Sequence, residues 1–451
     1  MDNFLSASSA GIRSQIPVGF AKPGHPSQSN VADLVNKITQ RLDQRGLFND
    51  VTHRELREIN DILASLPPSK TQEVIAHLSD DSLKTWADEI DSSGLFGNGG
   101  LNVDERTELF SNLASQLDVA QLGRLYQAFE SSALRSELAD SVGRSMETDE
   151  VQAALNQRAE VLPNSTQRET LLIHVQGLER LQHADQMARF AADVYEDFDQ
   201  AAAPNTLLPG TRRLNPDRLP AELGISRNDL IDDSSGYYAA IYQQGQGDQA
   251  GYIVAFRGTE NGADWLTNLG SGVGFKMTQF KKADLLMAKL TESVGTERVE
   301  CAGHSLGGGL SNYVGMKHSV SSTAFNPKGT TWRERLELHG EHKLANKFVQ
   351  NYQVDSEVLT GVQEIADPVI MKALGPVIKL PAIRPDNQEG HMLWETLVEG
   401  AQLISPFHDA SHHDISDPID RHGMDYVRRG VDAKTEQSEA EALKMLFDSF
   451  E

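Results

Sequence analysis

The stretch VECAGHSLGGGLSNYVG, residues 299–315, combines two local patterns around a single serine. The run RVECAG at 298–303 is short and contains Val, Cys and Ala, which is typical of a buried strand. The run that begins at Leu306 predicts a helix over 306–317. The sequence therefore predicts that Ser305 occupies a sharp turn between a strand and a helix.

A serine in such a turn can act as a nucleophile. Its hydroxyl reacts poorly at neutral pH, so it needs a base within hydrogen-bond reach. Small residues two positions before and after it, here Gly303 and Gly307, let the strand and the helix approach closely. The first N–H groups of the helix can then stabilise a developing oxyanion. The competing interpretation, a glycine-rich loop that packs a helix on a strand, gives no reason for a serine at the central position.

The surrounding chain alternates between β-rich and helical segments. Strands are expected at 236–244, 250–258, 298–303, 320–326 and 347–354. Helices are expected at 183–198, 276–293, 306–317 and 331–346. Alternation of this kind predicts an α/β fold with a mainly parallel central sheet.

The segment YIVAFRGTENGADWLTNL, residues 252–269, supplies a second element that this chemistry requires. It begins as a strand, breaks at Gly258 and resumes as a helix near Asp264. Open α/β sheets bind ligands at the carboxyl ends of their strands, and a backbone N–H at Thr259 would lie there. We therefore expect Thr259 to contribute an oxyanion donor, with an ordinary strand-to-helix turn as the alternative.

Together, AFRGTENGADWLTNL at 255–269 and GHSLGGGL at 303–310 resemble the class 3 lipase family of the α/β-hydrolase superfamily. The likeness extends over about residues 165–430, and within the family the chain looks most like lipase-type effectors of bacterial secretion systems. The resemblance implies an α/β-hydrolase fold in which Ser305 is the nucleophile. It also implies that the N–H groups of Thr259 and Leu306 form the oxyanion hole.

The acid of the triad should follow the nucleophile in the chain and precede the base. The segment FVQNYQVDSEVLT, residues 348–360, predicts a strand that ends at Asp355. Class 3 lipases carry their triad aspartate at that kind of position, so the resemblance favours Asp355. Asp367 is the rival, because an Asp-Pro-Val string also occurs near the acid of this family.

The base is sought among the histidines toward the C-terminal end. His422 directly precedes a predicted helix, and comparable lipase-like effectors carry a His-Gly-Met string there. His408 and His413 remain alternatives. The run FHDASHHD at 407–414 also suggests a metal cluster, but a zinc site needs three or four converging ligands and the serine turn needs no metal. We therefore expect neither a metal nor a cofactor.

The chain is expected to have four parts. They are a disordered leader at 1–30, a helical domain at 31–160, the α/β-hydrolase domain at 161–431 and an acidic C-terminal tail at 432–451. The leader is polar and rich in Ser, Gly and Pro, and the tail is either an amphipathic helix or loose. The helical domain contains two weak repeats, which begin at Gly46 and Gly94.

Composition excludes several classes of protein. With 41 Lys and Arg against 65 Asp and Glu, the formal net charge is −24, which would repel nucleic acid and anionic membrane surfaces. No apolar run approaches the ~20 residues needed to cross a bilayer. The N-terminal end lacks the basic and apolar regions of a Sec signal peptide. The single cysteine, Cys301, excludes an intrachain disulfide and is expected to be buried.

These features predict a serine carboxylic-ester hydrolase. The resemblance implies a lipase or phospholipase that acts on membrane acyl lipids through an acyl-enzyme and contacts the membrane only transiently. It also implies an effector that is secreted without a Sec signal, with a chaperone, immunity or export partner bound by the helical domain. The alternative is a catalytically silent binding or adaptor protein, in which the helical repeats carry the activity on a hydrolase scaffold.

Overall fold

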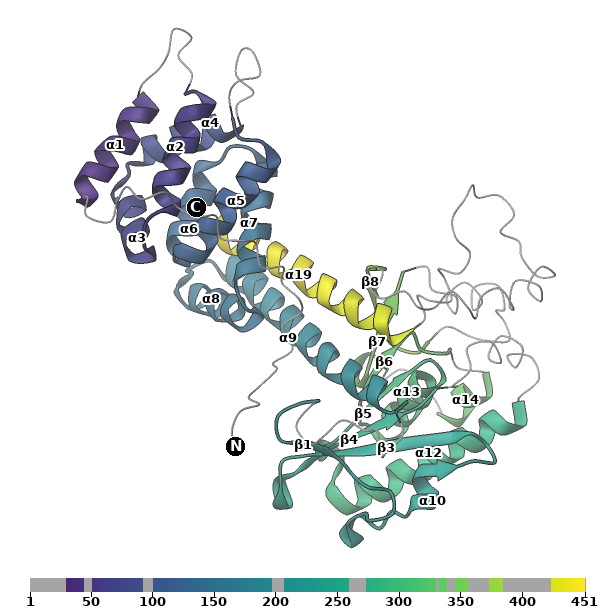
Figure 1. Cartoon of the computed structure of the whole chain (residues 1–451). Coiled ribbons are helices and arrows are strands. Elements are labelled where there is room, and N and C mark those ends of the chain that lie inside the picture. The colour runs from purple at the N-terminus through teal and green to yellow at the C-terminus, as the bar shows by residue number, and fades with distance from the viewer. Residues whose placement is uncertain are drawn as a thin grey trace, which may run out of the picture. The chain divides into compact units, whose positions relative to one another are not determined.

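The computed structural model describes residues 30–43, 51–91, 100–196, 207–258, 273–329, 332–338, 345–355, 373–383 and 423–450. These stretches form two compact units, and Figure 1 labels most of their elements. The first unit contains the described residues up to Ser145 together with Phe447–Phe450, and the second lies within Met146–Leu446. This division falls before the boundary expected at residue 160, because α8 (Thr148–Val161) packs against α9 (Ser165–Asp193) of the second unit.

The first unit is helical. After α1 (Val31–Asp43) come two runs of three helices: α2 (His53–Ala64), α3 (Pro68–His77) and α4 (Asp80–Asp91), then α5 (Val103–Gln116), α6 (Val119–Ala128) and α7 (Ser132–Ser145). Both runs start with a capping box, formed by Thr52 with Glu55 and by Asn102 with Glu105. Such boxes satisfy N–H groups at a helix start, so each predicted repeat begins with the same local device.

The end of the chain belongs to the core of this helical unit. The ring of Phe447 lies 5.2 Å from that of Tyr126, and Gln127 Nε2 donates to the Phe447 carbonyl at 2.8 Å. Phe447 is the last but one residue of α19 (Met424–Asp448), so the segment expected as an acidic tail is a helix rather than loose. Its apolar side chains at Leu443, Leu446 and Phe447 are buried, and this burial fixes the helix.

The second unit is built on a mixed sheet with strand order β1-β3-β4-β5-β6-β7-β8 and with β2 paired to β3. Its strands are β1 (Thr211–Arg213), β2 (Ile231–Asp232), β3 (Tyr237–Gln244), β4 (Gly251–Phe256), β5 (Val299–His304), β6 (Ser321–Phe325), β7 (Val349–Val354) and β8 (Val377–Leu380). The strands from β4 to β8 are parallel, whereas β1, β2 and β4 each pair antiparallel with β3. The predicted α/β class with a mainly parallel sheet is therefore confirmed.

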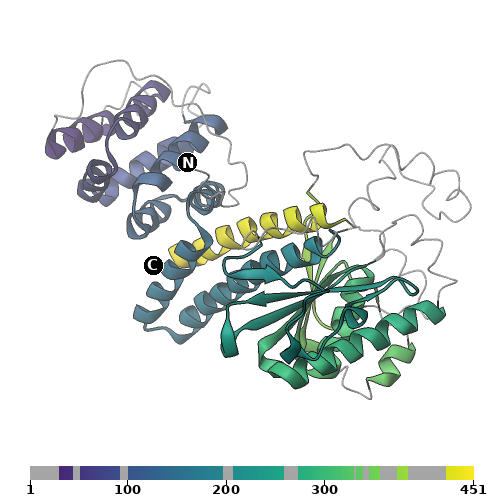
Figure 2. The same ribbon diagram turned by 60° about the horizontal axis from the view of Figure 1, so that its bottom comes forward.

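Helices cover both faces of the sheet. Side chains of α12 (Val273–Val294) and α13 (Leu306–His318) pack with alternate residues of β3, β4 and β5 in one apolar core. Side chains of α9 and α19 pack with the intervening residues of the same strands in a second core. Figure 2 shows α9 and α19 on one side of the sheet and α12 on the other. The parallel strands are thus buried on both faces, as their almost continuous apolar sequences require.

A buried polar network fixes α13 against the sheet. Asn312 of α13 donates from Nδ2 to Asn351 Oδ1 of β7 at 2.7 Å and accepts from Ser322 Oγ of β6 at 3.0 Å. Asn351 in turn donates to the Leu374 carbonyl at 2.7 Å. Buried polar groups are costly unless they are paired, so this network specifies one register of α13 on β6 and β7.

Candidate active site

Ser305 occupies a strained turn between β5 and α13. Its backbone has φ 58° and ψ −123°, in the left-handed half of conformational space that residues other than glycine rarely adopt. Three backbone hydrogen bonds hold it there: its N–H donates to Phe325 O at 3.0 Å, and its carbonyl accepts from Gly309 N at 3.1 Å and from Lys328 N at 2.9 Å. The adjacent strand β6 and the loop that follows it therefore enforce the turn.

Gly303 and Gly307 let the strand and the helix meet at this turn. A Cβ on Gly303 would overlap the Gly307 carbonyl and lie 2.8 Å from Gly308 N. A Cβ on Gly307 would overlap the Phe256 carbonyl oxygen of β4 and lie 2.7 Å from its carbon. No larger residue fits at either position without moving backbone, which explains why the sequence has glycine at both.

Leu306 is the first residue of α13 and is buried. The first N–H groups of a helix have no partner within it, and they carry the positive end of the helix dipole. The first hydrogen bond along α13 is donated by Gly309, so the Leu306 N–H precedes the helical ladder and adjoins the Ser305 hydroxyl in the chain. Thr259 lies outside the described residues, one position beyond Gly258, which follows β4.

Asp355 follows β7 directly, and the residue is exposed. Its N–H donates to Leu380 O of β8 at 2.9 Å. Asn326, which follows β6 with φ 41°, donates its N–H to Tyr352 O at 2.8 Å and accepts from Val354 N on its side chain at 2.9 Å. Buried Asn326 thus fixes the end of β7 relative to β6, and with it the start of the Asp355 segment.

The parallel sheet brings Ser305 and Asp355 to the same edge, because β5 and β7 end there. Two strand spacings separate them, which amounts to about 10 Å. An imidazole with a hydrogen bond on each ring nitrogen can bridge such a gap once the serine and aspartate side chains reach inward. The candidate base His422 and its alternatives His408 and His413 lie outside the described residues, as does Asp367.

The structure adds a side chain that the sequence did not indicate. The hydroxyl of Tyr195, two residues beyond α9, accepts from Gly258 N at 3.0 Å and is hydrogen-bonded to His304 Nδ1 at 3.0 Å. Gly258 precedes Thr259 and His304 precedes Ser305, so this hydroxyl joins the two segments on which the predicted chemistry depends. No motif connects a tyrosine so far upstream with either segment.

Cys301 is buried in β5, four residues before Ser305. Burial raises the pKa of its thiol to about 12, so the thiol stays neutral at physiological pH. Since the thiolate is the nucleophilic form, Cys301 does not compete with Ser305. The expectation of a buried, small apolar side chain is confirmed.

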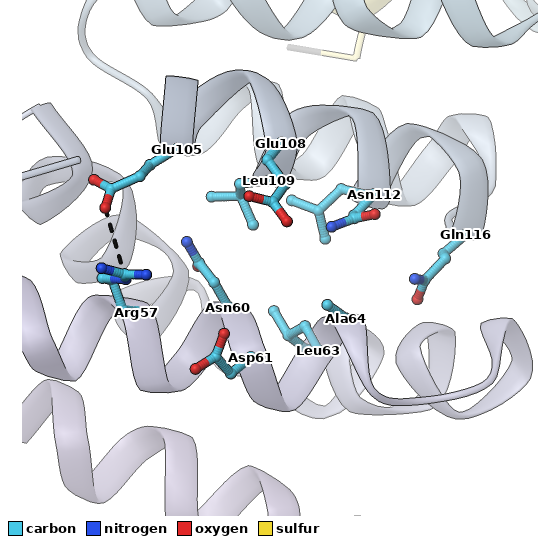
Figure 3. A pocket seen from close by; sticks show the side chains of 11 residues that line it. Arg57, Asn60, Asp61, Leu63, Ala64, Glu105, Glu108, Leu109, Asn112 and Gln116 are labelled. Carbon is cyan, nitrogen blue, oxygen red and sulfur yellow. Dashed lines mark ion pairs between the residues drawn. The ribbon is translucent and has the colours of Figure 1, made fainter. Parts of the chain in front are cut away.

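A pocket of about 60 Å³ lies between α2 and α5 of the helical unit (Figure 3). Arg57, Asn60, Glu105 and Gln116 are among the side chains around it, and Arg57 is paired with Glu105 at one end. None of the predicted site residues lines it.

Across the described stretches, no group of three or more His, Cys, Asp or Glu residues could hold a metal, and the run at 407–414 lies outside them. Among the described helices, none is both long and apolar enough to span a bilayer.

Comparison with known proteins identifies what the second unit is similar to. Residues 186–400 match the family model of the Tle-like phospholipase domain. Over 199 residues, 43% of this chain, the sequence is 30% identical to extracellular phospholipase A1 of Serratia liquefaciens, and the match spans 58% of that protein. The matched family region contains Ser305 and Asp355 and ends before His422. The resemblance to a lipase-type effector family is therefore confirmed, with residues 186–400 similar to the Tle-like phospholipase domain.

Proposed function

We propose that the protein is a serine ester hydrolase with an α/β-hydrolase fold that cleaves acyl esters of phospholipids. Ser305 attacks the ester carbonyl, while His422 takes its proton and returns it to the leaving alcohol. Asp355 orients His422 and stabilises the imidazolium. The N–H groups of Thr259 and Leu306 hold the oxyanion, and water then releases the fatty acid from the acyl-enzyme.

The backbone of Ser305 carries this proposal. A residue other than glycine at φ 58° costs about 1–3 kcal/mol and persists only where the surroundings enforce it. Glycine would take this turn without strain, and glycines stand at four of the positions from 303 to 309. The chain therefore keeps a strained backbone at a position that combines a hydroxyl with the N-terminus of a helix directly after it. Nucleophilic attack uses the hydroxyl as the nucleophile and the helix N-terminus as the site that stabilises the oxyanion.

Phospholipids are the proposed substrates because a phospholipase-domain model and a phospholipase A1 both match this region. The net charge of −24 disfavours anionic membrane surfaces, so we expect zwitterionic lipids to be the better substrates. The relative is extracellular by name, which supports action outside the producing cell. A route that bypasses the Sec signal, and a chaperone, immunity or export partner held by the helical unit, belong to the same proposal.

The nucleophile is tested by comparing two serines at opposite ends of α13. Ser305 and Ser319 both have positive φ, at 58° and 55°, but Ser319 is exposed beyond the helix C-terminus. We expect Ser305→Ala to lower kcat/KM on phosphatidylcholine roughly a thousandfold or more, and Ser319→Ala to leave it unchanged. A fluorophosphonate should label Ser305 in the wild type. Equal inactivity of the wild type and Ser305→Ala on every ester would favour the silent scaffold instead.

The acid, the base and the hydrolysed bond are tested separately. Asp355→Asn and His422→Ala should each lower kcat strongly while lipid binding is retained. The control substitutions Asp367→Asn and His408→Ala should leave kcat unchanged. A loss confined to Asp367 or to His408 would reassign that role and leave Ser305 in place. Phosphatidylcholine with different acyl chains at its two positions identifies the bond, and we expect release from the first glycerol carbon, as the name of the relative suggests.

A further inference from the structure

Tyr195 is hydrogen-bonded to two segments that are distant in sequence. Its hydroxyl accepts from Gly258 N at 3.0 Å across 63 residues, and it lies 3.0 Å from His304 Nδ1 across 109 residues. Depending on the tautomer of His304, the hydroxyl donates to Nδ1 or accepts from it. The two rings also meet edge to face, with centroids 5.9 Å apart. One oxygen atom thus fixes the position of the backbone after β4 relative to the end of β5.

Gly258 lies directly against the turn that carries Ser305. A Cβ on Gly258 would lie 2.5 Å from the Tyr195 hydroxyl, 2.8 Å from the His304 carbonyl oxygen and 3.2 Å from Ser305 Cβ. Such contacts leave no room for a side chain. The chain therefore passes beside the nucleophile at the position immediately before Thr259.

A buried ion pair holds the end of α9, from which Tyr195 projects. Arg213 of β1 and Asp193, the last residue of α9, pair at 3.1 Å with side chains only 3% and 4% exposed. Asp193 also accepts from Tyr242 Oη of β3 at 2.6 Å, and Arg213 Nη1 donates to the Glu196 carbonyl at 3.1 Å. These bonds fix the backbone on both sides of Tyr195, so its hydroxyl has a defined position.

We propose that Tyr195 is a positioning residue for ester hydrolysis, which holds the segment leading into Thr259 against the Ser305 turn. The inference rests on the proposed function. Because the Gly258 N–H is engaged by Tyr195, this segment must supply its oxyanion donor from a later residue, and Thr259 comes next. Without the hydroxyl, the Gly258 N–H and His304 Nδ1 lose their shared partner. Displacement of catalytic groups by about 1 Å can cost on the order of a hundredfold in rate.

The test compares two Tyr→Phe variants that each remove one hydroxyl between α9 and the rest of the unit. Tyr195→Phe removes the oxygen that joins Gly258 and His304. Tyr352→Phe removes a buried hydroxyl that donates to the Arg180 carbonyl of α9 at 3.1 Å and touches neither segment. Both variants are assayed with phosphatidylcholine below their melting temperatures, and their rates of fluorophosphonate labelling at Ser305 are measured.

We expect Tyr195→Phe to lower kcat roughly 10- to 100-fold with KM nearly unchanged, and to slow fluorophosphonate labelling by a similar factor. Tyr352→Phe should melt at a lower temperature but keep the wild-type kcat and labelling rate. Backbone hydrogen exchange at Gly258 should accelerate only in Tyr195→Phe, which gives a readout that does not depend on turnover.

The outcomes separate this inference from the proposed function. If the wild type hydrolyses the lipid, Ser305→Ala does not and Tyr195→Phe matches the wild type, the positioning role is overturned and the function stands. Equal losses of kcat in both Tyr→Phe variants would show that the Tyr195 hydroxyl contributes only to stability. This result would also overturn the positioning role. A wild type that neither hydrolyses esters nor labels at Ser305 overturns the proposed function, and the positioning role with it.

Discussion

Replacing Gly307 by alanine tests whether close packing of α13 on β4 builds the Ser305 turn. In an isolated helix this change stabilises by about 1 kcal/mol, because alanine has the higher helix propensity. Here the new Cβ would overlap the Phe256 carbonyl oxygen and lie 2.7 Å from its carbon and 3.0 Å from the Arg257 carbonyl carbon. All of these are backbone atoms of β4 or its extension, so no flexible side chain can give way. We expect the substitution to be destabilising.

The size of the effect follows from how far the helix must move. Ordinary contacts begin at 3.4 Å, so α13 and β4 must separate by about 0.7 Å or more at the Phe256 carbonyl carbon. Overpacking of this kind costs about 1–3 kcal/mol. The shift also lengthens the bonds from Ser305 N to Phe325 O and from Lys328 N to Ser305 O, each worth about 1 kcal/mol. After the helix-propensity gain is subtracted, we expect a net loss of about 2–4 kcal/mol, or about 5–15 °C in Tm.

The assay is calorimetric measurement of thermal unfolding, and a substitution at a second glycine is the control. Gly177 lies within α9, and a Cβ built there meets no atom within 4 Å. Gly177→Ala should therefore stabilise by about 0.5–1 kcal/mol through helix propensity alone. The two substitutions are chemically identical and both lie in helices. Stability changes of opposite sign can therefore be attributed to the contact between Gly307 and β4. A Gly307→Ala chain that melts at or above the wild-type temperature and keeps its activity would refute this reasoning.

Two substitutions and one labelling experiment probe the turn and the residues around it. Ser305→Gly should abolish hydrolysis but raise the free energy of unfolding by about 1–2 kcal/mol. The gain is expected because glycine adopts the φ of 58° without strain. A Tm below that of the wild type would contradict the claim that the Ser305 backbone is strained. Asp193→Ala should lower the free energy of unfolding by about 3–5 kcal/mol, because it removes the carboxylate that pairs with the buried Arg213 guanidinium. A loss below about 1 kcal/mol in denaturant unfolding would contradict that account. Cys301, whose pKa is raised to about 12 by burial, should resist thiol reagents at pH 8 until the unit unfolds, and rapid labelling of the folded chain would show that the core opens.

The central strands could be predicted from the sequence, whereas the edges of the sheet could not. The five expected strands correspond to β3–β7, whose apolar runs are long enough to be recognised. The strands β1, β2 and β8 contain only three, two and four residues. In so short a segment, pairing is decided by the neighbouring strand rather than by the segment's own pattern.

The last helix carried a signal that its composition obscured. The sequence DAKTEQSEAEALKMLFDSFE, from 432, is acidic and polar, a composition compatible with either an amphipathic helix or a loose tail. Leu443, Leu446 and Phe447 nevertheless follow the i, i+3, i+4 spacing of a buried helical stripe, and all three are fully buried. Periodicity was therefore the better guide than charge, because a charged outer face is compatible with a buried inner one.

The candidate site shows why motifs report backbone constraints better than side-chain partners. At Gly303 and Gly307 a side chain would overlap backbone atoms, so only one residue type fits and the pattern is visible in the sequence. The contact of Tyr195 with Gly258 and His304 imposes no such restriction on its own segment, since many polar side chains can accept an N–H. It also depends on the position of the end of α9, where Asp193 pairs with Arg213 of β1. The strained strand-to-helix turn at Ser305 could therefore be predicted from five residues. The tyrosine that we propose as a positioning residue could be found only once the fold had brought the end of α9 to the end of β5.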